Sequence, residues 1–167
     1  MSQIDFRIPR SAVEGADDET LCWAVVEPIW PDQLYEDELA RIAQGTAGQQ
    51  AIYCTMLFAR EVDNGGLRQF LANSSGLYWR NVVTGLKLLD ANEHLAALLT
   101  ALNIFPEGEP SLEQSERKEV LNRMNANQQA AIRSAEDIMY AAGGFEEMLR
   151  PRWKRYIDAH PDEFFSQ

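Results

Sequence analysis

The sequence has few cysteines and no long apolar run. The only two cysteines of this 167-residue chain, Cys22 and Cys54, form no CxxC pair. We expect both to be buried on helices, and the spacing alone does not decide whether they form a disulfide with each other. No apolar stretch approaches the roughly 20 residues needed to cross a bilayer, and the N-terminus lacks the apolar core of a secretory signal. We therefore expect a soluble, cytoplasmic protein with no membrane partner.

Basic residues are also scarce. Fifteen Lys and Arg stand against 26 Asp and Glu, which gives a net charge of −11, and ten of the acids lie within residues 1–40. Such a charge repels nucleic-acid phosphates and attracts basic proteins. Although bases gather in residues 150–155, we expect no direct binding of nucleic acid.

Residues suited to catalysis or metal binding are few. The chain has two histidines, His94 and His160, and neither a GxSxG nucleophile turn nor an HExxH zinc motif. The run from Asp63 to Gly66 lacks the ligands of a calcium loop. We predict no catalytic residue, no metal and no cofactor. If the chain were an enzyme, Glu61, Asp63 and His94 would be the one cluster to test.

Hydrophobic spacing is helical almost throughout, and no alternating window favours a strand. The sequence therefore predicts an all-α fold, a single compact domain of about eight helices. Residues 1–37 read as an acidic N-terminal segment with one helix, packed on a helical domain of residues 38–167. Residues 48–63 are apolar nearly all round, which is typical of a central helix. The predicted helices lie near residues 17–25, 32–44, 48–63, 67–72, 75–89 (capped by Ser74 or Ser75), 93–103, 111–124, 128–142 and 146–159.

The acidic residues include a helical pattern. Ser111 to Gln114 matches a capping box that would begin a helix, and Glu109, Glu113 and Glu116 are spaced as neighbours on one helix face, about 5–6 Å apart. Duplex DNA carries one charge per ~3.4 Å of each strand, so such a row resembles a line of phosphates. The alternative is a solvated face with local ion pairs, Glu113 with Arg117 and Asp37 with Arg41. The predicted partner-binding carboxylates are Asp17, Asp18, Glu19, Glu36, Asp37, Glu38, Glu109, Glu113 and Glu116.

The run from Glu61 to Gly76, EVDNGGLRQFLANSSG, resembles the signature of a bacterial DNA-mimic protein family, close to EVNNGGFxQFFxNSSG. The chain departs from it at Asp63, Leu67 and Leu71. The similarity extends over about residues 38–165, including Phe105 to Gly108. It implies a helical fold and, for the namesake of the family, an acidic surface that occupies the DNA-binding face of a transcription repressor. We expect the signature itself to shape the fold through Asn64, Gly65, Gly66, Phe70, Asn73 and Gly76.

Charge, carboxylate spacing and this resemblance together predict a non-enzymatic acidic protein that competes with DNA. Its partner would be a basic DNA-binding protein, either a transcription regulator or a nucleoid protein. The alternative is an immunity or antitoxin-like protein that neutralises a basic toxin through the same electrostatics. The sequence leaves the identity of the partner and the formation of a homodimer open.

Overall fold

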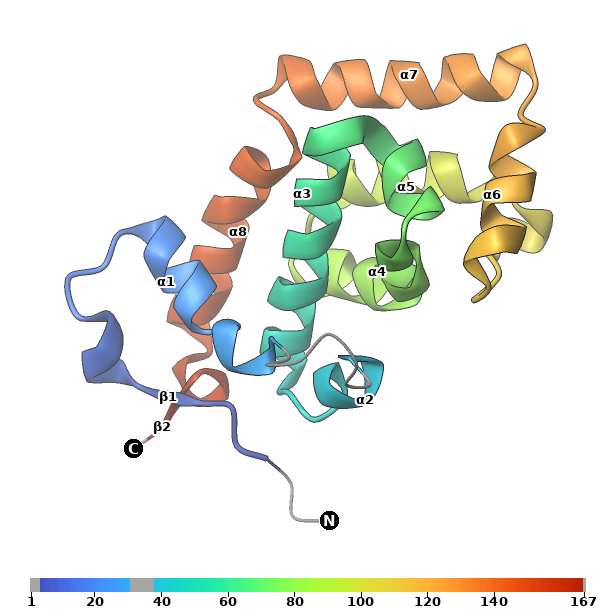
Figure 1. Ribbon diagram of the computed structural model, residues 1–167. Helices are drawn as coiled ribbons and strands as arrows, with labels where there is room; N and C mark the ends of the chain where they lie inside the picture. The colour runs from blue at the N-terminus through green and yellow to red at the C-terminus, as the bar shows by residue number, and fades with distance from the viewer. Residues whose placement is uncertain (1–3, 31–37, 167) are drawn as a thin grey trace.

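The computed structural model describes residues 4–30 and 38–166 and shows a single all-α domain (Figure 1). This confirms the predicted fold class. The described residues contain eight α-helices: α1 (Asp18–Ala24), α2 (Glu38–Ile42), α3 (Ala47–Ala72), α4 (Trp79–Leu88), α5 (Asn92–Leu102), α6 (Gln114–Asn122), α7 (Ala126–Ala141) and α8 (Phe145–Ala159). Five short 3₁₀ helices join them: η1 (Arg10–Val13), η2 (Glu27–Ile29), η3 (Ser74–Tyr78), η4 (Pro106–Gly108) and η5 (Pro161–Glu163).

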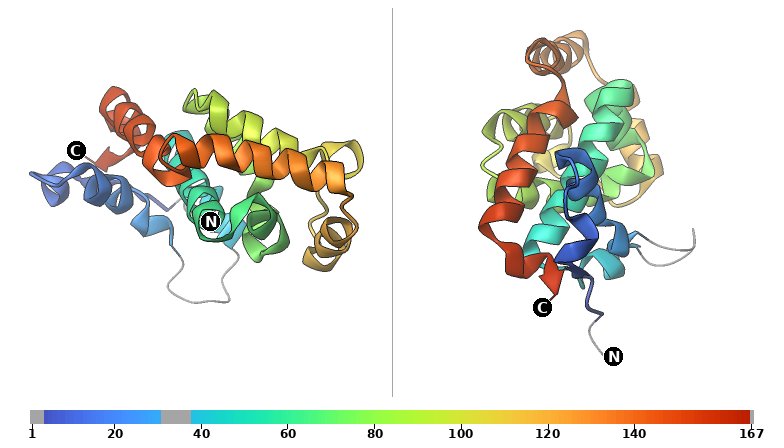
Figure 2. Two further views of the ribbon diagram at one scale, coloured as in Figure 1. Left: turned by 90° about the horizontal axis from the view of Figure 1, so that it is seen from above. Right: turned by 90° about the vertical axis from the view of Figure 1, so that its left-hand side faces the viewer.

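Helix α3 is the centre of the domain. It contacts α4, α5, α6, α7 and α8, and the views in Figures 1 and 2 show these helices arranged around it. Ile52, Phe58 and Val62 are fully buried, because a helix covered from several sides must be apolar around its circumference. A capping box between Thr46 and Gln49 fixes its first turn. The prediction of a central helix in this region is confirmed.

The Gly65–Gly66 break predicted from the sequence is present inside α3. Gly66 has φ +81° and ψ 173°, which is far from helical geometry. That region of conformational space is open almost only to glycine. The chain therefore bends at Gly66, and residues 67–72 continue as a second helical segment.

The two ends of the chain lie together. Strand β1 (Ile8–Pro9) pairs in parallel with β2 (Phe165–Ser166), and α1 packs against α8. The sequence did not predict these strands, because two residues are too few to show an alternating pattern. The division of the chain at residue 38 stays a prediction.

The structure tests the predicted helix over residues 32–44, the predicted capping box at Ser111 and the two cysteines. The helix predicted over 32–44 is present as α2, from Glu38 to Ile42, and its earlier residues lie outside those described. The capping box at Ser111 is wrong, since α6 begins only at Gln114 and Glu113 is its N-cap residue. Cys22 and Cys54 are buried, as predicted, and both are free thiols.

Candidate partner-binding surface

Six of the nine predicted acidic residues lie at two opposite ends of the domain. Asp17, Asp18 and Glu19 are at the start of α1, whereas Glu113 and Glu116 are at the start of α6. Figures 1 and 2 place α1 and α6 on opposite sides of the central helix. Glu36 and Asp37, and hence the predicted pair of Asp37 with Arg41, lie outside the described residues. The structure thus separates acids that the sequence analysis combined into one surface.

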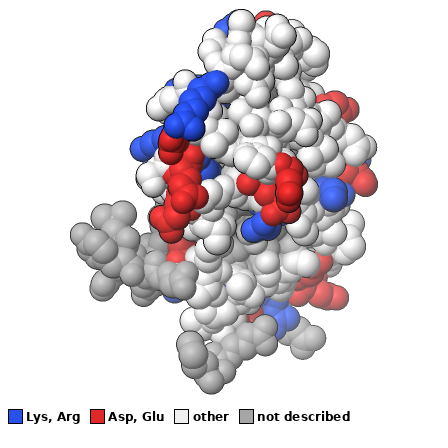
Figure 3. All heavy atoms as spheres, turned by 90° about the vertical axis from the view of Figure 1, so that its right-hand side faces the viewer, with Lys and Arg blue, Asp and Glu red and all other residues white. Residues whose placement is uncertain are grey.

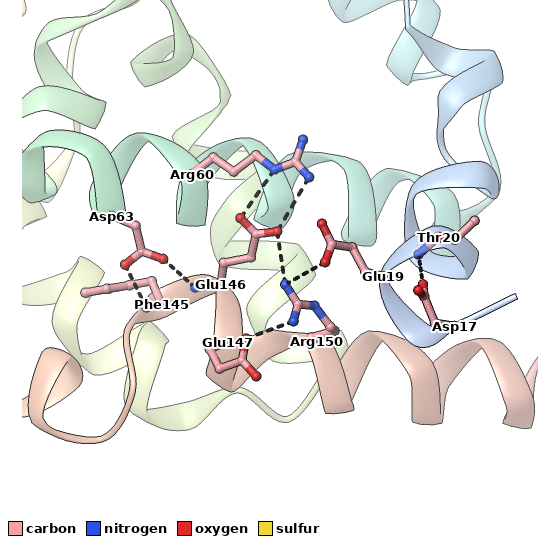
Figure 4. A network of polar contacts seen from close by, with 9 residues as sticks. All are labelled: Asp17, Glu19, Thr20, Arg60, Asp63, Phe145, Glu146, Glu147 and Arg150. Atoms are coloured by element: carbon pink, nitrogen blue, oxygen red, sulfur yellow. Dashed lines mark hydrogen bonds and ion pairs between the residues drawn. The ribbon is translucent and has the colours of Figure 1, made fainter.

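At one end, the first turns of α1 and α8 form a group that we call the α1–α8 acidic cluster, consisting of Asp17, Asp18, Glu19, Glu146 and Glu147. Figure 4 shows these residues apart from Asp18. Acidic residues favour the first turn of a helix because they interact well with its exposed N–H groups and dipole. Packing of α1 on α8 brings the two first turns together. Sequence analysis missed Glu146 and Glu147, although their place just after Gly144 was a visible signal.

Ion pairs neutralise part of this cluster. Arg150 lies 2.8 Å from Glu147 and 3.7 Å from both Glu19 and Glu146. Arg60 approaches Glu146 at 3.3 Å. The five carboxylates therefore face the guanidinium groups of Arg60 and Arg150 and the ammonium of Lys154, whose pKa is raised by its hydrogen bond with Asp158 and by the charge of Asp18. The cluster thus keeps an excess of negative charge.

Two residues of the cluster differ in their freedom to bind a partner. Asp17 accepts a hydrogen bond of 2.8 Å from the backbone N–H of Thr20, and this bond lowers the pKa of the Asp17 carboxyl. Asp18 is exposed and has no hydrogen bond or ion pair with any described residue. Asp17 therefore stabilises the helix start, while Asp18 is available for contact.

At the other end, the predicted helical row does not form. Glu109 precedes the helix and pairs with Arg80 at 2.8 Å. The Ser111 hydroxyl donates to Glu116 at 2.5 Å, and the carboxylate of Glu113 is exposed and forms no hydrogen bond or ion pair with a described residue. Figure 3 shows that acidic patches on the face carrying α6 are separated by uncharged surface and by basic side chains.

Glu38 is held inside the structure by two tyrosines. Its two carboxylate oxygens accept hydrogen bonds from the hydroxyls of Tyr53, at 2.6 Å, and Tyr78, at 2.5 Å. Burial and the neighbouring carboxylate raise the pKa of Tyr53 far above its usual range, so the hydroxyl remains a donor. Glu38 therefore anchors α2 to the core.

The family signature forms a hydrogen-bonded joint around Glu61. Its carboxylate accepts bonds from the side chains of Gln69 (2.9 Å), Asn73 (3.0 Å) and Ser75 (3.0 Å). These contacts hold the second segment of α3 against the first across the glycine break. Glu61 is thus engaged in structure on both oxygens.

Residues on either side of the same glycine break form hydrogen bonds with two other helices, α7 and α8. The N–H of Leu67 donates to Glu136 of α7 at 2.6 Å, because the bend at Gly66 leaves this N–H without a helical acceptor. Asp63 accepts from the first two backbone N–H groups of α8, at 2.9 and 2.8 Å, which caps a helix that begins after glycine. The signature therefore links α3 to both α7 and α8.

Beyond the joint, Phe70 is fully buried and packs edge-to-face on Phe58 with ring centroids 5.0 Å apart. A Cβ atom on Gly76 would come within 2.9 Å of both the Phe70 carbonyl oxygen and the Arg117 Nε. Only glycine fits here. Asn64 is exposed, and its side chain has no contact among the described residues that explains its presence.

Arg117, which the sequence analysis paired with Glu113, is turned into the core instead. It is 1% exposed and donates to four backbone carbonyls: Leu71 (2.8 Å), Asn73 (2.7 Å), Ser111 (2.9 Å) and Leu112 (2.9 Å). The last carbonyls of a helix have no partner within the helix. Arg117 therefore caps the end of α3 and joins it to the segment that precedes α6.

The three residues considered for catalysis have separate roles. Glu61 and Asp63 hold the contacts described above, and His94 is fully buried. Its Nε2 lies 3.0 Å from the carbonyl oxygen of Phe145, so Nε2 carries the proton and donates. No group of three or more His, Cys, Asp or Glu side chains is arranged to hold a metal ion within residues 4–30 and 38–166. Nor does this part of the chain contain a helix long and apolar enough to cross a membrane.

Comparison with known proteins gives one match. No curated protein and no solved structure matches the chain. The sequence model of the DMP19-like protein family matches residues 43–160, which is more than two thirds of the chain and includes the whole of the Glu61–Gly76 signature. The chain therefore belongs to the DMP19-like protein family, a family of DNA-mimic proteins.

Proposed function

We propose that this protein is a non-enzymatic, cytoplasmic DNA mimic that occupies the DNA-binding surface of a basic transcription regulator or nucleoid protein. The observation that carries the proposal is the family match over residues 43–160. The net charge of −11 supplies the physical means, because it attracts the basic surfaces that bind DNA and repels DNA itself.

The carboxylates that we assign to partner binding are those with the least commitment to the fold. The carboxylates of Asp18 and Glu113 form no hydrogen bond or ion pair with a described residue, and Glu19 is 66% exposed with its arginine at 3.7 Å. Exposed ion pairs contribute only about 0–1 kcal/mol, so a partner arginine can displace Arg80 from Glu109 or Arg150 from Glu19. Glu38 is left out because two tyrosines hold it.

Two separated acidic ends imply two contacts with the partner. The α1 end includes Asp17, Asp18 and Glu19, joined by Glu146 and Glu147, and the α6 end includes Glu109, Glu113 and Glu116. Glu36 and Asp37 stay in the proposed surface on sequence grounds. Since these charges are exposed, binding should weaken steeply as salt screens them.

Competition with DNA tests the proposal. The immobilised protein is incubated at low salt with lysate of its source cells and eluted first with duplex DNA, then with sodium chloride. We expect duplex DNA to release DNA-binding proteins. Capture of proteins that salt releases but DNA does not would contradict the proposal.

Paired charge variants locate the surface. The variants Asp18→Asn with Glu19→Gln, and Glu113→Gln with Glu116→Gln, each remove two charges from one end. Asp137→Asn with Asp162→Asn removes two exposed charges elsewhere on the described surface, and neither carboxylate forms a hydrogen bond or ion pair with a described residue. Each of the first two variants should displace DNA from the captured partner about fivefold less well, as for rim charges that steer association. Equal effects of all three would show that only net charge matters and would contradict the assignment of residues.

A further inference from the structure

A groove of about 730 Å³ lies between the start of α3 and α4. Its floor is formed where the two helices approach most closely, since a Cβ on Gly85 would lie 3.0 Å from the backbone of Ala51. Leu88 forms an apolar wall and is 40% exposed. This volume is within the range of small-molecule sites, which combine apolar walls with a few polar groups.

The charge of the groove is opposite to that of the protein. Its lining includes Arg80 and Lys87 and no carboxylate. The ammonium of Lys87 forms no hydrogen bond or ion pair with any described residue. A neighbouring hollow shares Leu88 and is lined by Arg155, by Asp90 and by Arg152, which pairs with Glu93.

Polar groups in the groove are also free to bind. Asn81 lines it, and its side-chain amide has no partner among the described residues. Arg80 is held by Glu109, but both side chains are more than half exposed, at 56% and 58%, and such a pair is weak. An anion placed here would meet a lysine, an amide and an exchangeable guanidinium.

We propose that this groove binds a small organic anion, an apolar body that carries one carboxylate or phosphate group. The anionic group lies against Lys87 and Asn81, and the apolar body lies against Leu88 and the floor at Gly85. A nucleic acid is disfavoured, because its many phosphates would meet the field of a protein of net charge −11. The groove adjoins the α6 end of the proposed DNA-mimic surface through the Arg80–Glu109 pair, but binding of a small anion at Lys87 and Asn81 does not require a DNA-mimic function.

Three ligands with one aromatic body test the proposal: naphthyl phosphate, naphthoate and the uncharged naphthylmethanol. Each is titrated into the isotopically labelled full chain and followed by amide chemical shifts. We expect shifts at residues 47–51 and 80–88, and at least one of the two anions to bind about tenfold more tightly than the alcohol, as for a charge-assisted hydrogen bond. The stronger of the two anions identifies the head group. Equal binding of all three ligands, or shifts confined to other residues, would overturn the proposal.

Variants separate a specific site from general charge attraction. Lys87→Gln should weaken binding of the preferred anion about tenfold and leave the alcohol unchanged, while Lys87→Arg should retain binding. Arg133→Gln makes the same change of charge on α7, where Arg133 lines a different hollow and has no partner among the described residues. It should alter anion binding less than about twofold. An equal loss in Lys87→Gln and Arg133→Gln would refute a site at the groove.

Discussion

Replacing Arg117 with methionine removes the charged cap at the end of α3 while keeping an unbranched side chain in the core. In the native protein the guanidinium of Arg117 is buried and donates to four carbonyls, at 2.7 to 2.9 Å. Burial lowers the pKa of Arg117, although an arginine remains protonated in proteins. The variant therefore loses a positive charge together with all four bonds.

The expected loss of stability follows from these contacts. A hydrogen bond to a charged group contributes about 1.5–3 kcal/mol, and the four bonds here are not additive. Removing the charge also removes its own desolvation cost, which offsets part of the loss. We expect Arg117→Met to lower the free energy of unfolding by about 3–5 kcal/mol. Arg117→Lys should not restore it, because a lysine has three donors in a different geometry.

Urea unfolding followed by far-ultraviolet circular dichroism measures this change. Arg123→Met is the matched control, because Arg123 is 76% exposed and pairs only with Glu119. Arg123→Met should lower the free energy of unfolding by less than about 1 kcal/mol. If Arg117→Met cost no more than the control, the four carbonyls would not depend on the guanidinium, and the reasoning would be refuted.

The remaining predictions concern the glycine break, the buried histidine and the thiols. Gly66→Ala should lower the free energy of unfolding in urea by about 2–4 kcal/mol, because alanine is strained at positive φ and its Cβ would collide with a carboxylate of α7. Gly143 is also at positive φ but has open space around it, so Gly143→Ala should lower this free energy less. An equal loss in the two variants would contradict a role for the collision. Burial lowers the pKa of His94 below its ordinary 6.5. As the pH falls, the unfolded chain therefore binds a proton at His94 before the folded protein does, and stability declines below about pH 6.5. The urea midpoint of His94→Gln should depend less on pH in this range, and an unchanged dependence would show that other groups cause the decline. Burial raises the pKa of both Cys22 and Cys54 to about 12. Neither thiol should therefore react with a disulfide reagent near pH 8 until urea is added. Rapid reaction of the native protein would contradict the prediction, because it would show that a thiol is accessible.

The secondary structure was largely readable because its signals are local. Apolar spacing marked the central helix, and Gly65–Gly66 marked its break, since both depend on residues within a few turns of one another. The start of α6 was misplaced because Ser111 uses its hydroxyl to contact Glu116 and the N–H of Glu113. The Ser111 hydroxyl thus accepts from a backbone N–H two residues later and donates to a carboxylate five residues later, and Ser111 itself stays outside the helix.

The candidate surface was less predictable because it depends on which helix ends meet. Glu146 and Glu147 are far from Asp18 in sequence and join it only because α1 packs on α8. The ion pair of Arg150 with Glu19, which crosses this junction, has the same origin. No spacing rule within one helix describes such contacts.

The sequence by itself determined the all-α fold, the acidic charge and the family, because composition, helical periodicity and the Glu61–Gly76 signature are properties of the chain before it folds. Tertiary structure alone decided which charges remain free. It turned Arg117 into the core, placed Glu38 between two tyrosines and divided the described acids between two ends of the domain. A side chain's availability depends on its distance to groups remote in sequence, and those distances are set only when the helices pack.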